Sequence, residues 1–285
     1  MKAKLVLAAG ALLACSPAQA ATVFGVDGND NLVSFNSASP ETFTRSVRIT
    51  GASGILGLDF RPLNNVLYGL GSDRVVYTIN TITGMATAVS GVLNLGPLST
   101  QFAFDFNPTI DRLRIITNSD DNFVFNPNDG SLTTATDVFY AAGDANQGRD
   151  PNITAVAYTS ANFGDPGTAT QLYGIDTDRD SLTRVANSAG TLNTVGSLGV
   201  DVGSRDSFDI LGNDAFLIDG RNFYSVNLNS GALTQIGRTD ESLFGIAISG
   251  GVVPEPSTWA LMILGFGAIG GAMRYRTRKV TFATA

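Results

Sequence analysis

Three aspartates recur at one position of short apolar segments in this sequence. Asp59 stands in residues 57–60 (GLDF), Asp105 in residues 103–106 (AFDF) and Asp209 in residues 207–210 (SFDI). Carboxylates that converge repel one another unless a cation or an arginine neutralises them. If the fold brings these aspartates together in a central channel, we expect a site at the channel mouth for a cation, with calcium as the candidate, or for another ligand.

The same aspartates have a structural interpretation, which we favour. Each carboxylate then accepts hydrogen bonds from backbone amides or pairs with an arginine, and so ties neighbouring segments together. Arg61, Arg112 and Arg114 are near enough in sequence to be such partners.

A second acidic set lies in polar stretches between apolar runs. Asp176, Asp178 and Asp180 alternate as in a calcium loop, but the stretch has no glycine at the sixth position and no distal Glu. Residues 27–31 and 119–122 have similar compositions, and Asp and Asn favour tight turns. We therefore predict turns here, with Asp176, Asp178 and Asp180 as weak metal candidates and no resident metal or cofactor.

The residue inventory limits the possible chemistry. There is no histidine, and the one cysteine is Cys15. A mature chain that lacks both has no Ser-His-Asp triad, no zinc site built on His or Cys, and no disulfide. We predict a protein that is not an enzyme. The alternative is an extracytoplasmic hydrolase or lyase that uses Asp, Tyr and Arg, with calcium as a possible helper.

The elements that carry these residues repeat along the chain. Five similar units each contain two apolar strands joined by a polar turn, and their equivalent positions are Phe24, Tyr68, Arg114, Tyr173 and Phe216. A further strand precedes each pair and another follows it. Four strands in about 44 residues are typical of a propeller blade. The long spacing between the third and fourth units contains a Gly/Pro/Thr-rich insertion at residues 161–170.

The ends of the repeat region complement each other. Residues 22–27 have no strand before them, and residues 243–248 have no partners after them. Pairing the two would complete a fifth sheet and remove two exposed strand edges. We predict an all-β, five-bladed β-propeller that is closed by its N-terminal and C-terminal strands. An open β-solenoid or two packed sandwiches are the alternatives.

Charge excludes one class of partner. Between residues 21 and 253 the chain has 12 arginines, no lysine and 24 acidic residues. Nucleic-acid affinity comes largely from neutralising phosphates, so this region would repel nucleic acid. Cations and neutral sugars remain compatible with it.

The N-terminus has the features of a signal peptide. Lys2 and Lys4 precede an apolar run, and the small residues Ala18 and Ala20 stand before Ala21. We predict a signal helix over residues 1–20 that signal peptidase removes after Ala20, which leaves a propeller domain over residues 21–250. The alternative is a lipoprotein signal in which Cys15 is acylated.

The last segment, residues 251–285, contains a Pro-Glu-Pro triplet, a short apolar run and a basic cluster. An apolar run of about 15 residues is short for a transmembrane helix, and the basic cluster favours a cytoplasmic end. The segment closely resembles the PEP-CTERM sorting signal. The matching residues are Pro254, Glu255, Pro256, Trp259, Arg274, Arg276 and Arg278.

This resemblance implies processing by an exosortase, a membrane-embedded enzyme, in a Gram-negative bacterium that secretes exopolysaccharide. It also implies that the membrane span is transient, and a permanent single-span anchor is the alternative. We expect the protein to cross the inner membrane and to reach the cell surface or the medium.

The body of the chain also resembles a known family. Residues 57–62 (GLDFRP), 67–70 (LYGL) and 104–114 (FDFNPTIDRLR) are similar to the family called domain of unknown function 4394. The resemblance covers nearly all of residues 22–248, and that family has no established activity. Together these features predict an exported, sorted, non-enzymatic propeller that binds or decorates an extracellular polymer.

Overall fold

The computed structural model describes residues 20–96, 101–159, 170–212 and 214–249. These residues form 21 strands and one short 3₁₀ helix, Asn187–Ala189. No helix in these ranges is long and apolar enough to cross a membrane. The predicted signal helix, the sorting segment with its transmembrane helix, and most of the insertion at residues 161–170 lie outside the described residues.

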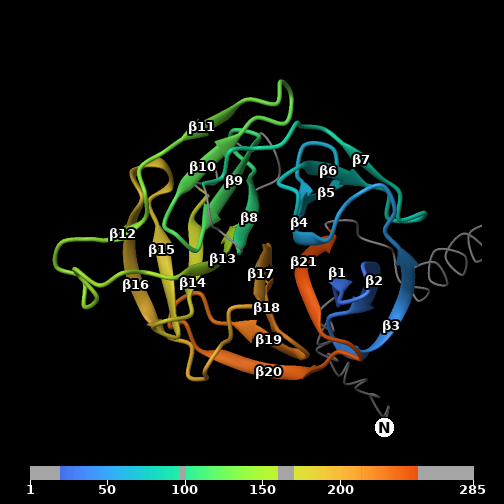
Figure 1. Cartoon of the computed structure of the whole chain (residues 1–285). Coiled ribbons are helices and arrows are strands. Elements are labelled where there is room, and N and C mark those ends of the chain that lie inside the picture. The colour runs from blue at the N-terminus through green and yellow to red at the C-terminus, as the bar shows by residue number, and fades with distance from the viewer. Residues whose placement is uncertain (1–19, 97–100, 160–169, 213, 250–285) are drawn as a thin grey trace, which may run out of the picture. The chain divides into compact units, whose positions relative to one another are not determined.

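The strands form five sheets that follow one another around a central axis (Figure 1), so the all-β, five-bladed propeller is confirmed. We number the sheets as blades from the N-terminus. Blade 1 is β21 (Leu243–Ser249), β1 (Thr22–Asp27), β2 (Asn31–Asn36) and β3 (Ser39–Arg48). Blade 2 is β4 (Ile55–Arg61), β5 (Val66–Gly71), β6 (Val76–Ile79) and β7 (Ala86–Ala88). Blade 3 is β8 (Phe102–Asn107), β9 (Arg112–Thr117), β10 (Asn122–Phe125) and β11 (Leu132–Thr134).

The last two blades complete the ring. Blade 4 is β13 (Ile153–Tyr158), β14 (Leu172–Asp176), β15 (Ser181–Val185) and β16 (Thr191–Ser197), with β12 (Phe139–Tyr140) added parallel to β16. Blade 5 is β17 (Asp206–Leu211), β18 (Asp214–Asp219), β19 (Asn222–Val226) and β20 (Leu233–Arg238). The first strand of each blade in this order, namely β21, β4, β8, β13 or β17, is the inner strand.

Tight polar turns join the strands, as the sequence predicts. Asp30, Asp120 and Asp180 adopt positive φ angles of 57°, 68° and 44°. Asp and Asn tolerate this left-handed conformation better than most residues because their short side chains bond the nearby backbone. The acidic residues at these positions therefore have a turn-forming role.

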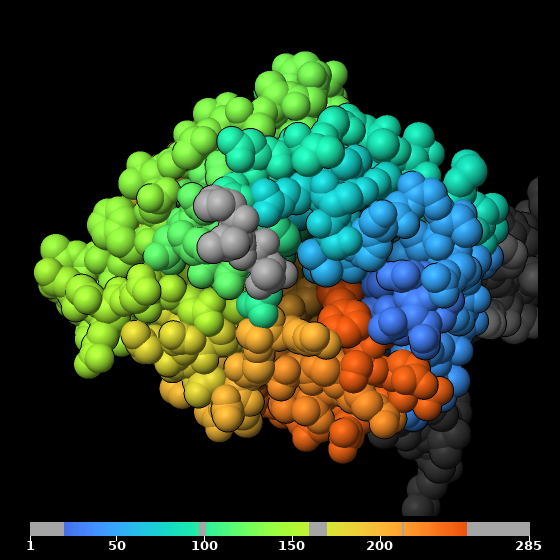
Figure 2. Space-filling view, in the orientation of Figure 1, coloured from blue at the N-terminus to red at the C-terminus, as the bar shows by residue number. Residues whose placement is uncertain are grey.

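Both ends of the propeller lie in blade 1. Strand β1 pairs with β2 on one side and with β21 on the other, where Thr22 faces Ser249 and Val23 faces Ile248. Figure 2 shows the blue N-terminal residues beside the orange-red C-terminal ones. This pairing was the predicted closure, and it covers the inner edge of β1 with β21, which is the inner strand of the blade.

The hydrophobic core lies between the blades. The described residues form five buried clusters, and each one joins two neighbouring blades. Phe35 of blade 1 meets Phe223 of blade 5 edge to face, with ring centroids 5.2 Å apart. Gly57 allows a close approach near the axis, because a Cβ atom there would lie 2.7 Å from Cβ of Phe104 in the next blade. Inner strands are thereby held close to one another.

Candidate functional site

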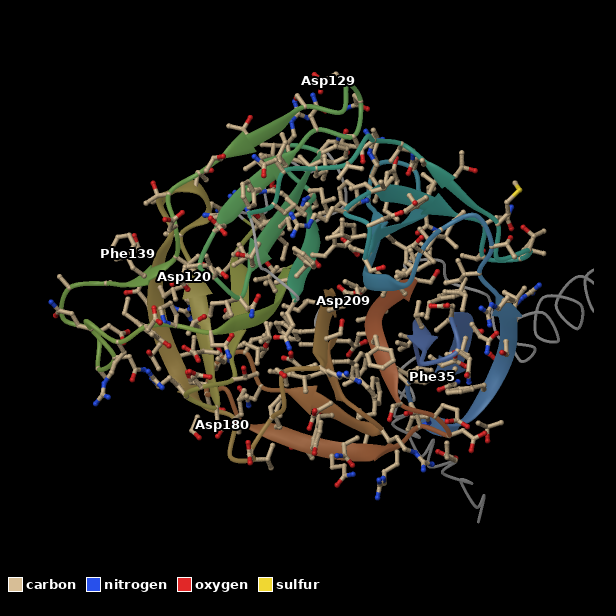
Figure 3. All side chains as sticks on the ribbon, in the orientation of Figure 1. Phe35, Asp120, Asp129, Phe139, Asp180 and Asp209 are labelled. Carbon is tan, nitrogen blue, oxygen red and sulfur yellow. The ribbon has the colours of Figure 1, made fainter. Side chains whose placement is uncertain are left out.

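The three aspartates that recur in the sequence meet at the axis of the ring. Asp59, Asp105 and Asp209 lie on the inner strands β4, β8 and β17, and each is at most 6% exposed. One carboxylate oxygen from each lies within 4.8 Å of the other two. Figure 3 places Asp209 near the centre of the ring, far from the peripheral Asp129 and Phe139. We call this set the axial aspartates.

Each axial aspartate ties its blade to the next one around the ring. The Phe106 amide donates to Asp59 (2.7 Å), the Tyr158 amide to Asp105 (2.9 Å) and the Ile248 amide to Asp209 (2.5 Å). In every case the donor belongs to the next blade. It is the residue directly after the position that corresponds to the aspartate. These bonds have the geometry that the structural interpretation predicts, whereas a ligand role for the set stays a prediction.

Two blades have no axial aspartate, and this explains why two backbone amides bond the aspartate of their own strand. Ala157 and Ala247 occupy the equivalent positions of blades 4 and 1, so nothing from those side chains reaches the next amide. The Ile210 amide instead donates to its own neighbour Asp209 at 2.6 Å, and the Phe60 amide bonds Asp59. Asp59 and Asp209 therefore each accept two amides, while Asp105 receives the Tyr158 amide.

Burial dominates the electrostatics of the axial aspartates. It raises the pKa of Asp59 and of Asp105 well above the usual range, and the neighbouring carboxylates add to the rise. Burial also raises the pKa of Asp209 to about 6, against the opposing effect of its two amide bonds. The buried cluster therefore takes up protons at a higher pH than exposed carboxylates do.

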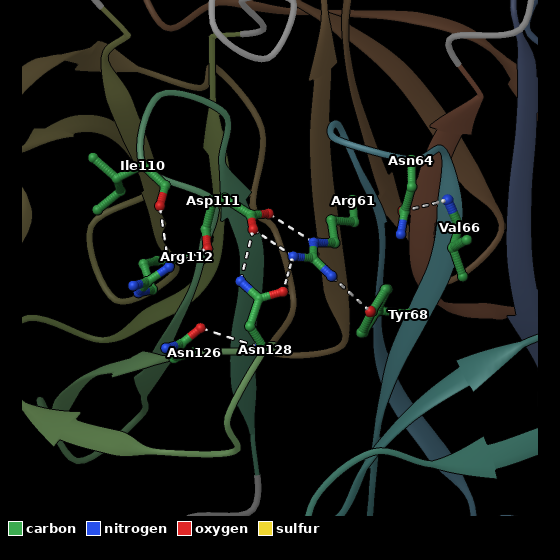
Figure 4. Close-up of polar contacts among 9 residues, drawn as sticks. All are labelled: Arg61, Asn64, Val66, Tyr68, Ile110, Asp111, Arg112, Asn126 and Asn128. Atoms are coloured by element: carbon green, nitrogen blue, oxygen red, sulfur yellow. Dashed lines mark hydrogen bonds and ion pairs between the residues drawn. The ribbon is translucent and has the colours of Figure 1, made fainter.

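The arginines suggested as partners bind elsewhere. Arg61 donates from Nε to Oδ1 of Asp111 (2.6 Å) and from Nη2 to Asp111 and Asn128, while its Nη1 reaches the Tyr68 hydroxyl (Figure 4). This buried network joins blade 2 to blade 3. The Asp111 carboxylate raises the pKa of Arg61, and Arg61 lowers that of Asp111.

The other two arginines also turn away from the axial aspartates. Arg114 donates to Asn122 (2.8 Å), and Arg112 donates to the backbone oxygens of Ile110 and Asp111. The suggestion that arginines neutralise the axial carboxylates is therefore wrong in the described structure, because these guanidinium groups are committed to other partners.

The alternating carboxylates of blade 4 point to separate partners. Asp176 accepts the Asp178 amide (2.9 Å) and the Tyr140 hydroxyl, so it closes the turn and anchors β12. Asp178 accepts the Asn152 side chain, and Asp180 accepts the Val202 amide. Among the described residues, three carboxylates lie close enough to share a metal ion at the axial aspartates, and those of this turn do not.

A separate cavity of about 390 Å³ was not predicted from the sequence. We call it the axial cavity. All five inner strands contribute to its wall, with Leu56, Phe102, Thr154, Asp206 and Phe244. The exposed residues Gly28, Ser204 and Arg205 border it, and none of the axial aspartates does. The axial aspartates lie outside this cavity, so the channel site that we expect at Asp59, Asp105 and Asp209 stays a prediction.

The polar groups of the axial cavity are unusual in one respect. Both carboxylate oxygens of Asp206 and the hydroxyl of Thr154 are buried without a hydrogen-bond partner. Burial raises the pKa of Asp206 to about 7, and a hydrogen-bonding interaction with Thr154, too poorly aligned to count as a normal hydrogen bond, offsets part of the rise. Asp206 begins a strand in an ordinary turn-like stretch, so the sequence carries no signal that distinguishes it.

Comparison with known families identifies the two parts of the chain. The model described as "Domain of unknown function (DUF4394)" matches residues 31–247. The chain belongs to this family. The DUF4394 match covers nearly the whole propeller, and its description assigns no activity. No curated protein matches the chain.

Solved structures resemble the DUF4394 propeller in fold. A chain in the crystal structure of a nidogen/laminin complex is 13% identical, with a TM-score of 0.51, over 80% of this chain and 98% of that chain. A gluconolactonase from Xanthomonas campestris is 14% identical, with a TM-score of 0.48, over 80% of both chains. At 13% identity, the resemblance to the nidogen/laminin chain supports the fold alone.

The second family match is the PEP-CTERM protein-sorting motif, over residues 252–279. It begins three residues after the last strand of the propeller, which ends at Ser249. This motif implies secretion and membrane-associated sorting with an exosortase as the processing partner. The predicted resemblance of both segments is therefore confirmed, and the structure of the motif lies outside the described residues.

Proposed function

We propose that this protein is an exported, sorted DUF4394 propeller that binds extracellular polymer, such as the exopolysaccharide of a biofilm matrix, and does not catalyse a reaction on it. The observation that carries the proposal is the sorting motif, which directly follows a complete propeller. A closed ring of sheets is complete in itself, so a sorting motif that follows it in the sequence can direct its export and sorting.

Binding suits the residues at the axis better than catalysis. The sequence has no histidine, and Cys15 lies in the segment that signal peptidase is expected to remove. Of the acidic residues that border the axial cavity, Asp27 is occupied by the Asn29 and Asn31 amides at 2.8 and 2.9 Å. The Asp206 carboxylate is free to accept hydrogen bonds from a ligand.

The processing steps follow from the two terminal segments. Signal peptidase would cut after Ala20, and the Pro-Glu-Pro triplet at residues 254–256 would direct an exosortase to the C-terminal segment. The arginines at 274, 276 and 278 would hold the C-terminal end in the cytoplasm while the propeller is exported. The mature protein then consists essentially of the propeller, at the cell surface or in the medium.

Sorting is tested by replacing Pro254, Glu255 and Pro256 with alanine in a host that contains an exosortase. We expect the variant to remain in the membrane fraction with its C-terminal segment intact, whereas the wild type leaves that fraction. Mass spectrometry of both proteins defines the mature termini and any attached groups. Ser257→Ala, one residue beyond the triplet, is the matched control and should be sorted normally.

Polymer binding is tested separately, by sedimenting the purified wild type with extracellular polymer from the same host. Co-sedimentation without shortening of the polymer supports a binding function. A wild type that cleaves the polymer would favour the enzyme alternative, and one that neither binds nor cleaves it would contradict the proposal.

A further inference from the structure

The axial cavity contains polar groups whose hydrogen-bonding capacity is unused. Thr154 is 5% exposed, lines the cavity and has no partner for its hydroxyl. Asp206, on the neighbouring inner strand, has two buried carboxylate oxygens without a partner. Buried polar groups in native proteins are nearly always paired, so an unpaired cluster beside a cavity indicates groups that a ligand completes.

The size and walls of the cavity indicate the kind of ligand. A volume of about 390 Å³ is in the range of small-molecule sites and far exceeds what one ion needs. Phe102 and Phe244 supply apolar wall, and the Arg205 guanidinium lies 5.4 Å from the centroid of the Phe244 ring. Aromatic surface next to unpaired oxygens suits a ring that has one apolar face and several hydroxyl groups.

Two observations narrow the ligand further. Among the described residues, the group of three carboxylates close enough to share a metal ion is the set of axial aspartates. None of them lines the axial cavity, so Asp206 lacks the carboxylate partners of a metal site. Asp27, Asp30 and Asp206 border the cavity against the single Arg205, and this excess of negative charge disfavours an anionic sugar. A ligand that donates hydrogen bonds without carrying negative charge remains.

We propose that the axial cavity binds a neutral sugar unit, with neighbouring hydroxyl groups donating to the two oxygens of Asp206 and bonding the hydroxyl of Thr154. This inference rests on the proposed function and specifies its site and its sugar class. Phe244 would cover the apolar face of the sugar ring, and Arg205 would border the opening.

Removing the Thr154 hydroxyl or the Asp206 carboxylate tests the proposal, because sugar binding and protein stability should respond differently. Thr154→Val keeps the shape of the side chain and removes a hydroxyl that has no partner, and Asp206→Asn removes a buried charge. Neither change should lower the thermal stability of the full chain, because neither side chain has a hydrogen bond of normal geometry to lose. Each should weaken sugar binding by about tenfold or more, because the ligand loses a hydrogen bond.

The probes are tetrasaccharides of glucose, mannose and galactose, with a galacturonate tetrasaccharide as the anionic comparison, measured by calorimetry on the detergent-solubilised full chain. Thr133→Val and Asp214→Asn are the matched controls, since both residues are exposed and neither borders the axial cavity. We expect one or more neutral probes to bind the wild type and both controls, and the galacturonate to bind none of them.

The alternative outcomes separate the two proposals. If the wild type binds neutral sugars and both cavity variants bind equally well, the site assignment is wrong and the proposed function stands. Preference for galacturonate, or binding of calcium alone that Asp206→Asn abolishes, would overturn the sugar class. If the wild type binds neither these probes nor the host polymer, the proposed function fails together with the inference.

Discussion

Asp105 differs from the other axial aspartates in its hydrogen bonds. The described structure gives it one backbone amide, from Tyr158, whereas Asp59 and Asp209 each receive two. Amide donors stabilise the charged form of a carboxylate. We therefore infer that Asp105 is the member of the set that most readily holds a proton, which relieves the repulsion among the three.

This inference predicts different outcomes for two substitutions of Asp105. Asp105→Asn keeps an oxygen for the Tyr158 amide and removes a buried charge, so the free energy of unfolding at pH 8 should stay the same or rise. Asp105→Leu leaves the amide without an acceptor and should lower it by about 1–3 kcal/mol. Urea unfolding measures both variants. Equal losses in both, together with calcium-dependent stabilisation of the wild type alone, would instead indicate a cation site.

Stability should also depend on pH in a direction that the raised pKa values define. Asp209 has a pKa of about 6 and Asp206 of about 7, while unfolded Asp titrates near 3.9. As the pH rises above about 4, the unfolded chain has lost these protons, whereas the folded protein releases them near pH 6 for Asp209 and near pH 7 for Asp206. The free energy of unfolding should therefore fall over this range.

Urea midpoints measured across that range check the pH dependence. The variant Asp206→Asn should flatten the upper part of the curve, because its side chain does not titrate. A midpoint that rises with pH between about 5 and about 7 would contradict the assignment.

The Arg61–Asp111 pair is a second residue-scale test. Arg61 is 5% exposed and Asp111 6% exposed, and the pair joins two blades. Asp111→Ala would leave a buried arginine without its counter-ion, at a cost of about 3–5 kcal/mol. The exposed pair Arg48–Asp30, at 3.6 Å, is the control, and Arg48→Ala, which leaves the Asp30 turn unchanged, should cost less than about 1 kcal/mol. Thermal unfolding compares the two, and equal losses would contradict this interpretation.

At the scale of the element, the pairing of β1 with β21 should decide whether the ring holds together. A chain that ends at residue 242 lacks β21 and exposes the edge of β1 and the buried face of β4. We expect it to aggregate or to be digested by protease. A chain that ends at residue 250 keeps every described strand and should resist digestion, which also tests the predicted boundary of the propeller.

The elements explain how far sequence reasoning reaches in this protein. Strands, turns and blade number are visible in the sequence because each blade repeats a local pattern of apolar runs and Asp or Asn turns. The axial aspartates were also found, since the repeats place them at equivalent positions. The axial cavity was not found, because Thr154 and Asp206 come from different blades and become neighbours when the inner strands β13 and β17 pack side by side.

At the scale of the whole molecule, the negative charge of the propeller favours neutral partners over anionic ones. The chain has a net charge of −7, and the region from 21 to 253 is more acidic still. Binding to a neutral polymer through hydrogen bonds and apolar contact should therefore change little between about 50 and about 500 mM NaCl, since screening acts on charge pairs. Sedimentation with the polymer at both salt concentrations measures this. A steep loss of binding with salt would indicate ion pairing instead.

The pairing of Thr22 with Ser249 places the two ends of the propeller side by side, so the fold should tolerate circular permutation. Facing residues of antiparallel strands lie about 5 Å apart at Cα, so a short linker would join the two ends into a continuous circle. New ends opened in a surface turn of any blade would then leave every sheet intact. The pairing of the first and last strands therefore makes the ring continuous, and the sheets would be the same wherever the ends were placed.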